Sequence, residues 1–225
     1  MQIRVVMVDD ETLVLDSLER ILDREKDITV VGTARTGPEA LQMVRRARPN
    51  VVLMDLRLTG EMDGVETTRR LRNSVNPPAV LAVTSFDTDV YMRGALDAGA
   101  TGFLLKNDAT DSLATAIRMA YQGDPMISPA LTSRLIASYI APQTDPVCDA
   151  ARRRVQGLSP REIQVAQMVG EGRTYDEIAH HLFISASTVK SAIGRAMSKV
   201  GADSGAQLAV VVAQARLDLL DGEPS

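Results

Sequence analysis

Short apolar runs alternate with longer amphipathic segments through the first 125 residues. This alternation is typical of β-α units around a parallel sheet, because a strand that is buried on both faces is apolar throughout and its crossover helix is apolar on one side only. The predicted strands are residues 3–8, 28–31, 51–54, 79–83 and 102–105. The predicted helices are residues 11–24, 37–47, 64–73, 88–98 and 110–122. We therefore predict an α/β fold with a doubly wound, five-stranded parallel sheet.

The pattern changes after residue 125. We predict a helix at residues 128–140, followed at 141–157 by a segment with two prolines and an Arg triplet, which we interpret as a linker. Beyond it, Ser159 with Pro160 next and Glu162 three residues on is a strong helix start. Four short-looped helices are expected in a small all-α helix-turn-helix domain, at about residues 159–170, 174–182, 186–200 and 204–219. The predicted organisation is residues 1–123, a linker at 124–156, and residues 157–225.

Composition restricts the classes of function. The chain has 225 residues, 45% of them hydrophobic and 24% charged, with a net charge of -4, which is unlike a disordered tail or a polycation. A single cysteine, Cys148, cannot form an internal disulfide and fits a reducing compartment. No apolar stretch approaches the roughly 18 residues of a membrane span, and the N-terminus lacks the long apolar core of a signal peptide. We expect a cytoplasmic protein with no membrane partner.

Charge is distributed unevenly along the chain. Residues 1–125 carry 15 basic and 19 acidic side chains, whereas residues 151–225 carry 9 and 8. Within the second segment, residues 184–201 contain Lys190, Arg195 and Lys199 and no acidic residue. This basic strip is where we expect contacts to a phosphate backbone.

Polar side chains follow four of the five predicted strands of the first segment. Asp9 and Asp10 follow the first strand, Asp55 the third, Thr84 the fourth and Lys106 the fifth. In doubly wound sheets ligands bind outside these carboxyl ends. Clustered carboxylates suit Mg²⁺, and a carboxylate can accept a phosphoryl group while a metal, a lysine and a hydroxyl neutralise the transferring oxygens. Each residue alone is more typical of a helix cap or a solvated surface group, but together they predict a phosphoacceptor site.

The order and spacing of these residues resemble the receiver domain of two-component response regulators, over residues 1 to about 123, and the resemblance implies a flavodoxin-like sheet. The resemblance implies that Asp55 is the phosphorylated residue and that Thr84 and Lys106 assist it. It implies that Thr84 and Phe103 form the switch, although a Phe packed in the core has the same sequence pattern. The implied ligands of Mg²⁺ are Asp9, Asp10, Asp55 and the backbone carbonyl of Arg57.

The loop after Asp55 departs from the family pattern. Receivers usually read Asp-x-x-Met-Pro-x-Met-Asp-Gly, whereas residues 55–64 contain no proline and one extra residue. We expect altered geometry beside the acceptor, with no ligand lost. By the same resemblance, Arg57 and Phe86 flank the phosphate, and we expect Phe86 to shield it from water and slow hydrolysis.

The predicted helices at 174–182 and 186–200 have the short connection of a helix-turn-helix. At about 100° per residue, Val189, Ile193, Met197 and Val200 form one apolar stripe on the second of them. Small hydroxyls and spaced cations on the other side suit the major groove of DNA, although an ordinary solvated helix has the same periodicity. The candidate DNA-binding residues are Ser187, Thr188, Lys190, Ser191, Arg195 and Lys199.

A longer string of residues strengthens this interpretation. About residues 157–215 resemble the LuxR-type helix-turn-helix of the NarL/FixJ response regulators. The resemblance rests on Leu158-Ser-Pro-Arg-Glu162, Glu177-Ile-Ala179 and Ser187-Thr-Val-Lys190. The resemblance implies binding to promoter DNA as a homodimer, with the last helix as the surface where two copies pair. From the sequence alone, that helix could equally serve only to cover the core of its own domain. Ala192 stands where His is common and Gly205 where Arg is common, so we expect fewer phosphate contacts.

We interpret the chain as a DNA-binding transcriptional response regulator and not as an enzyme. A sensor histidine kinase would phosphorylate Asp55 with Mg²⁺ as cofactor, and phosphorylation would control dimerisation and promoter binding. One alternative is an atypical regulator that is independent of phosphorylation and controlled by a partner or ligand, which the altered loop motivates. An aspartyl-phosphate hydrolase is disfavoured, because Asp55-Leu56-Arg57 lacks the second carboxylate that would act as acid and base.

Overall fold

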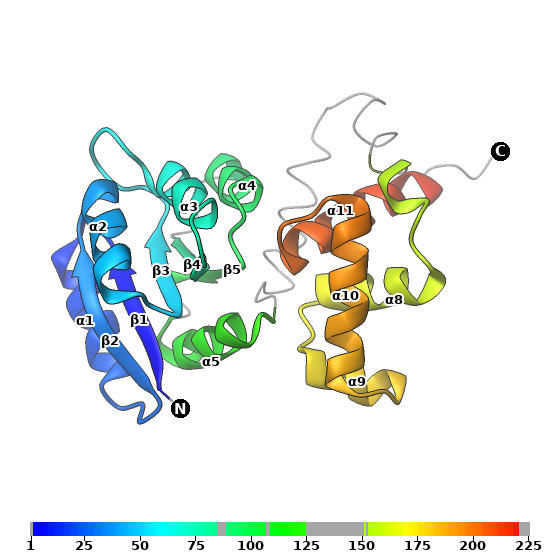
Figure 1. The fold of residues 1–225 in the computed structure, drawn as a ribbon, viewed down its shortest axis with the longest axis horizontal. Helices are drawn as coiled ribbons and strands as arrows, with labels where there is room; N and C mark the ends of the chain where they lie inside the picture. Colours follow the sequence, from blue (N-terminus) through cyan, green and yellow to red (C-terminus); the bar gives the residue numbers. More distant parts are fainter. Residues whose placement is uncertain (1, 85–88, 107–108, 125–150, 152, 221–225) are drawn as a thin grey trace. The chain divides into compact units, whose positions relative to one another are not determined.

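The computed structural model describes residues 2–84, 89–106, 109–124, 151 and 153–220 (Figure 1). The chain divides into two compact units, residues 1–126 and 127–225, and each is treated by itself. The helix predicted at 128–140, Cys148 and Phe86 lie outside the described residues. Within the described residues, no helix is both long enough and apolar enough to cross a membrane.

The first unit is built on a parallel sheet of five strands in the order β2-β1-β3-β4-β5. The strands are β1 (Ile3–Val8), β2 (Ile28–Ala34), β3 (Val51–Asp55), β4 (Ala79–Thr84) and β5 (Gly102–Leu105). This order is the flavodoxin-like one, and it confirms the predicted fold class. β2 runs three residues further than predicted, because Gly32–Ala34 continue the pairing with β1 although Gly and Thr interrupt the apolar run.

Helices cover both faces of the sheet (Figure 1). They are α1 (Thr12–Leu22), α2 (Gly37–Ala47), α3 (Gly64–Arg72), α4 (Asp89–Asp97) and α5 (Ala109–Gln122). Val5 and Met7 of β1 pack with α1 and α5, whereas Val6 and Val8 pack in the core beneath α2 and α3. Alternate side chains of a strand point to opposite faces, so a strand covered on both sides is apolar at every position.

The second unit is helical. It contains α8 (Pro160–Gly170), α9 (Tyr175–Leu182), α10 (Ala186–Val200) and α11 (Gly205–Leu220), which pack around one apolar core. Reciprocal hydrogen bonds of a capping box begin α8 at Ser159 and α9 at Thr174, as the sequence predicts for α8.

The end of the segment that we interpret as a linker also belongs to this unit. Ala151 and Val155 pack against Val211 and Ala215 of α11. Arg154 donates from Nε to the Val200 carbonyl at 2.7 Å, at the C-terminus of α10. An arginine in this place satisfies a carbonyl that the helix itself leaves without a donor.

Candidate functional site

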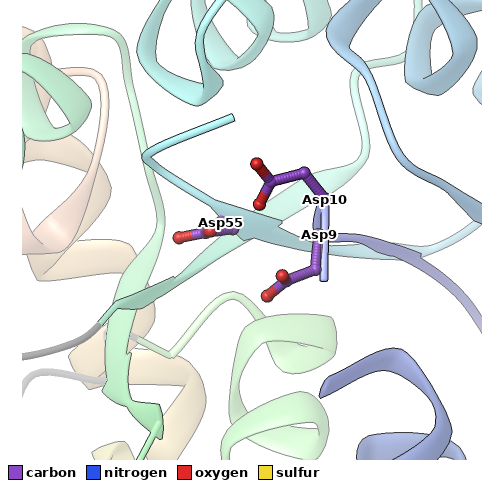
Figure 2. A group of neighbouring side chains, drawn as sticks. All are labelled: Asp9, Asp10 and Asp55. Atoms are coloured by element: carbon purple, nitrogen blue, oxygen red, sulfur yellow. The ribbon is translucent and has the colours of Figure 1, made fainter. Parts of the chain in front are cut away.

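Three carboxylates meet at the carboxyl edge of the sheet. Val8 pairs with Met54, so Asp9 and Asp55 follow as neighbours at the ends of β1 and β3. The chain leaves β1 for β2 on one side and reaches β3 on the other, which makes this the switch point where open α/β sheets bind ligands. One oxygen each from Asp9, Asp10 and Asp55 lies within 4.8 Å of the others (Figure 2). Oxygen donors at this spacing fit a hard cation such as Mg²⁺.

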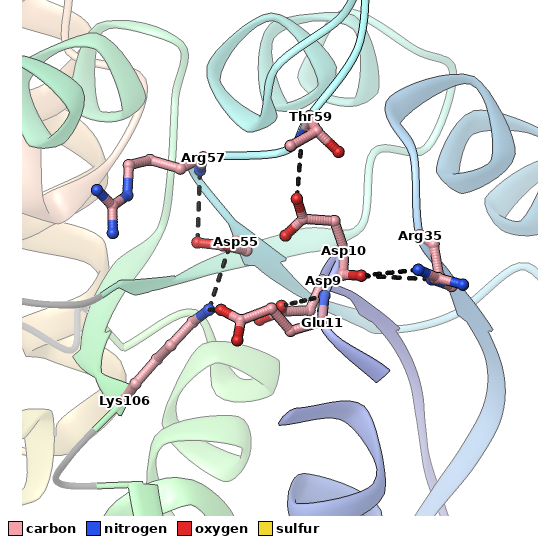
Figure 3. A network of polar contacts seen from close by, with 8 residues as sticks. All are labelled: Asp9, Asp10, Glu11, Arg35, Asp55, Arg57, Thr59 and Lys106. Atoms are coloured by element: carbon pink, nitrogen blue, oxygen red, sulfur yellow. Dashed lines mark hydrogen bonds and ion pairs between the residues drawn. The ribbon is translucent and has the colours of Figure 1, made fainter. Parts of the chain in front are cut away.

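Lys106, directly after β5, enters the same cluster (Figure 3). Its Nζ lies 2.7 Å from Asp9 Oδ2, 3.2 Å from Asp55 Oδ2 and 3.9 Å from Glu11 Oε1. Burial raises the pKa of Asp9 above its usual value, although the Lys106 hydrogen bond opposes the shift. Burial also disfavours the Lys106 ammonium, but the hydrogen bond to Asp9 and the Asp55 charge outweigh it and raise the pKa of Lys106. The site is rich in negative charge, because three carboxylates and the nearby Glu11 surround one lysine.

A backbone N–H holds each of the three carboxylates (Figure 3). Glu11 N donates to Asp9 Oδ1 at 3.0 Å, Arg57 N to Asp55 Oδ1 at 3.4 Å, and Thr59 N to Asp10 Oδ2 at 3.3 Å. Thr59 stands at the proline position of the usual receiver loop, and proline has no N–H to donate. The unusual loop thus adds a contact to the acidic cluster, which the sequence did not reveal.

Gly64 fixes the far end of that loop against the acceptor strand. Asp63 caps α3 by accepting the Glu66 N–H at 2.8 Å, and Gly64 is the first residue of the helix. A Cβ on Gly64 would lie 1.9 Å from the carbonyl oxygen of Asp55. Only glycine permits this close approach of the two backbones.

Thr84 and Phe103 stand on the adjoining strands. Thr84 is buried at the end of β4 and pairs with Leu105, the residue before Lys106. Phe103 is 1% exposed in β5, as a core residue would be. The guanidinium of Arg57 lies on the side of Asp55 that faces away from Asp9 and Asp10 (Figure 3).

The outer side of α10 carries the second set of predicted residues. All six candidates are exposed, whereas Val189, Ile193 and Val200 are buried. The six are Ser187, Thr188, Lys190, Ser191, Arg195 and Lys199. Ala192 is 3% exposed, so the expectation that its small size removes a phosphate contact is wrong: the position belongs to the core side of the helix.

Two of the six candidates face a carboxylate. Lys199 Nζ lies 2.8 Å from Glu162 Oε2, and Arg195 Nε lies 3.7 Å from Glu162 Oε1. Glu162 is 4% exposed and also accepts from Ser159 N and Oγ, at 2.8 and 3.0 Å. The hydrogen bonds from Lys199 and Ser159 lower the pKa of Glu162 to about 2. This link between α8 and α10 was missed from the sequence.

The first unit thus combines a flavodoxin-like sheet with an acidic site, and the second contains a helix-turn-helix. The family described as the response regulator receiver domain matches residues 5–118, and the luxR family of bacterial regulatory proteins matches residues 156–212. The class defined by these features is that of the response regulators. The chain belongs to this family, with a receiver domain and a LuxR-type DNA-binding domain, and is a DNA-binding transcriptional regulator of the two-component type.

Similar proteins match nearly the whole chain. The transcriptional regulatory protein LiaR of Bacillus subtilis is 31% identical over 208 residues, which cover 92% of this chain and 95% of LiaR. The oxygen regulatory protein NreC of Staphylococcus epidermidis is 32% identical over 206 residues, covering 91% and 94%. The crystal structure of the response regulator ChrA, from a haem-sensing two-component system, is 33% identical, with a TM-score of 0.54 and coverage of 97% and 98%.

Proposed function

We propose that Asp55 is the phosphoacceptor of this regulator and that Asp9, Asp10, Asp55 and the Arg57 backbone carbonyl hold Mg²⁺ beside it. The observation that carries the proposal is the convergence of three carboxylate oxygens within 4.8 Å at the switch point of the sheet. Lys106 compensates the negative charge only in part. A divalent cation would supply the positive charge that is missing, and it would also offset the negative charge that a phosphoryl group on Asp55 adds.

In the transfer, an oxygen of the Asp55 carboxylate attacks phosphorus on a phosphohistidine of a sensor kinase. The new P–O bond forms as the P–N bond breaks, and the imidazole leaves with the electron pair of that bond and takes up a proton. Bound Mg²⁺ would neutralise charge on the transferring oxygens. Lys106 Nζ now lies 3.2 Å from an Asp55 oxygen and would bind a phosphoryl oxygen instead after the transfer. Thr84 and Phe103 would then change conformation as the switch pair.

The output is promoter binding through α10. Ser187, Thr188, Lys190 and Ser191 are exposed on its N-terminal half, the part of a recognition helix that contacts base edges. Arg195 and Lys199 would contact phosphates further along, with their charge partly shared with Glu162. Phosphorylation would favour a homodimer that binds DNA more tightly, through a population shift of a few kcal/mol. Since promoter DNA is the target, we place the protein in the cytoplasm.

A regulator that is independent of phosphate is the second candidate. Two contacts favour it: Lys106 is closer to Asp9 than to Asp55, at 2.7 against 3.2 Å, and the Thr59 N–H already donates to Asp10. In such a regulator these internal contacts would replace the cation, and a partner or ligand would operate the output domain.

Intact-protein mass spectrometry after incubation with Mg²⁺ and acetyl phosphate separates the two candidates. We expect wild type and Asp16→Asn, which alters an exposed carboxylate on α1, to gain one phosphoryl group, and Asp55→Asn to gain none. Sizing of the same samples should show a shift to dimer with the modified proteins only. Absence of any gain in wild type would favour the phosphate-independent regulator.

A further inference from the structure

Five helices among the described residues end in the same way. In each, a residue with positive φ follows the last turn, and the N–H of the next residue donates to a carbonyl five residues earlier. The residues with positive φ are Gly99, Gly123, Gly172, Phe183 and Gly201. Glycine is the usual choice there, because a side chain is strained in the left-handed region. Phe183, with φ +53°, is the exception among these five. Arg48, with φ +45°, also follows a helix, α2, but Pro49 comes next and has no N–H to donate.

The Phe183 side chain does not stabilise the unit by packing. It is 93% exposed, and the apolar contact of this kind of helix end is made by the next residue, Ile184, which packs against the core of the unit. At Phe183 the chain therefore tolerates left-handed backbone together with an exposed aromatic ring, a combination that Arg48 and Asn76 do not have. Strain that is not offset by packing is typical of functional positions.

The location of Phe183 indicates what the ring contacts. Phe183 lies in the turn of the helix-turn-helix, two residues before Ser185, the N-cap of α10. Two residues span at most about 7 Å, so the ring stands beside the end of the recognition helix that enters the major groove. The chain has no acidic residue between Ile178 and Ala202, and α10 has none in its first turn. This surface is therefore compatible with the negative charge of nucleic acid.

We propose that Phe183 is a DNA-contact residue whose ring packs against deoxyribose at the rim of the major groove, next to the N-terminus of α10. The proposal rests on the DNA-binding function of the family and adds a residue that carries no charge and no hydrogen-bonding group. Such a contact contributes through burial of apolar surface, so its loss should weaken binding without changing the number of neutralised phosphates.

The test compares full-length wild type with Phe183→Gly and Phe183→Asn, since both replacements suit positive φ. The probe is a duplex selected by the wild-type protein from a random library. We expect both variants to bind it roughly tenfold more weakly, with the same dependence of affinity on salt. Their melting temperatures should equal or exceed that of wild type, by up to about 5 °C for Phe183→Gly. Val75→Ser, which removes an equally exposed apolar side chain from the first unit, should bind as wild type does.

Unchanged DNA affinity in both Phe183 variants would overturn the proposal. Weaker binding that coincides with loss of the dimer in samples without DNA would also overturn it, and would assign Phe183 to contact with a second copy of the chain. If the wild-type protein selects no duplex, the proposed DNA-binding function fails. If it selects a duplex that the variants bind equally well, only the proposed role of Phe183 fails.

Discussion

Each unit of this protein contains a cluster in which a lysine forms an ion pair with a buried carboxylate, yet the two clusters differ in the balance of positive and negative charge. Lys106 lies 2.7 Å from Asp9, and Lys199 lies 2.8 Å from Glu162. Around Lys106 there are three clustered carboxylates, and the pKa of Asp9 is raised. Around Glu162 there are two cations and two hydrogen bonds from one serine, and its pKa is lowered to about 2.

The difference separates a cluster that could hold a cation from one whose charge is already balanced. A carboxylate whose charge is more than matched by donors stabilises the packing of α8 on α10 and needs no ligand. Three carboxylates that share one lysine repel one another, and a bound cation would reduce that repulsion. The count of charges distinguishes the clusters: three carboxylates share one lysine in the first unit, whereas one carboxylate faces a lysine and an arginine in the second.

The largest effect is expected from Lys106→Met, which removes the compensating cation of the first cluster. The buried carboxylates would be left unpaired, so we expect the free energy of unfolding of the first unit to fall by about 3 kcal/mol in the presence of a chelator. Mg²⁺ should recover more stability in the variant than in wild type, because it replaces the missing charge. Urea denaturation with chelator and with Mg²⁺ measures both. Lys26→Met, at an exposed lysine, is the control, and a variant as stable as wild type in chelator would contradict the comparison.

A smaller effect is expected from Glu162→Gln, which should lower the stability of the second unit by about 1–3 kcal/mol at pH 7. The pKa of Glu162 falls from 4.5 to about 2 on folding, so its contribution is complete above pH 4.5 and is lost as the pH falls toward 2. The stability gap between wild type and variant should therefore narrow between pH 5 and about 2. Glu171→Gln, at an exposed ion pair with Arg173, should show little change. A gap that is constant with pH would show that Glu162 contributes by shape and not by charge.

The sequence predicted those parts of the two units that leave a periodic pattern of apolar residues or a polar residue at the end of a strand. Alternating apolar runs located the sheet, strand ends located Asp9, Asp55 and Lys106, and a 100° repeat located the exposed side of α10. It missed the link from Glu162 to Lys199, because these residues are 37 positions apart and only tertiary packing joins them. It missed the Thr59 contact, because a backbone donor leaves no trace in the identity of a side chain.

The smallest effect is expected from the hydrogen bond between the Thr59 N–H and Asp10 in the acidic cluster. Thr59→Pro removes the N–H that holds Asp10, whereas Thr59→Ala keeps it. A donor to one lone pair can orient a carboxylate while another lone pair faces the ion, and loss of such support weakens metal binding by about tenfold. We expect calorimetric titration with Mg²⁺ to show that loss for the proline variant and none for the alanine variant. Thermal unfolding of both variants verifies that the loop change leaves the fold intact. Equal affinity in the proline variant would mean that the loop does not position Asp10, and a loss in both variants would assign the effect to the threonine side chain.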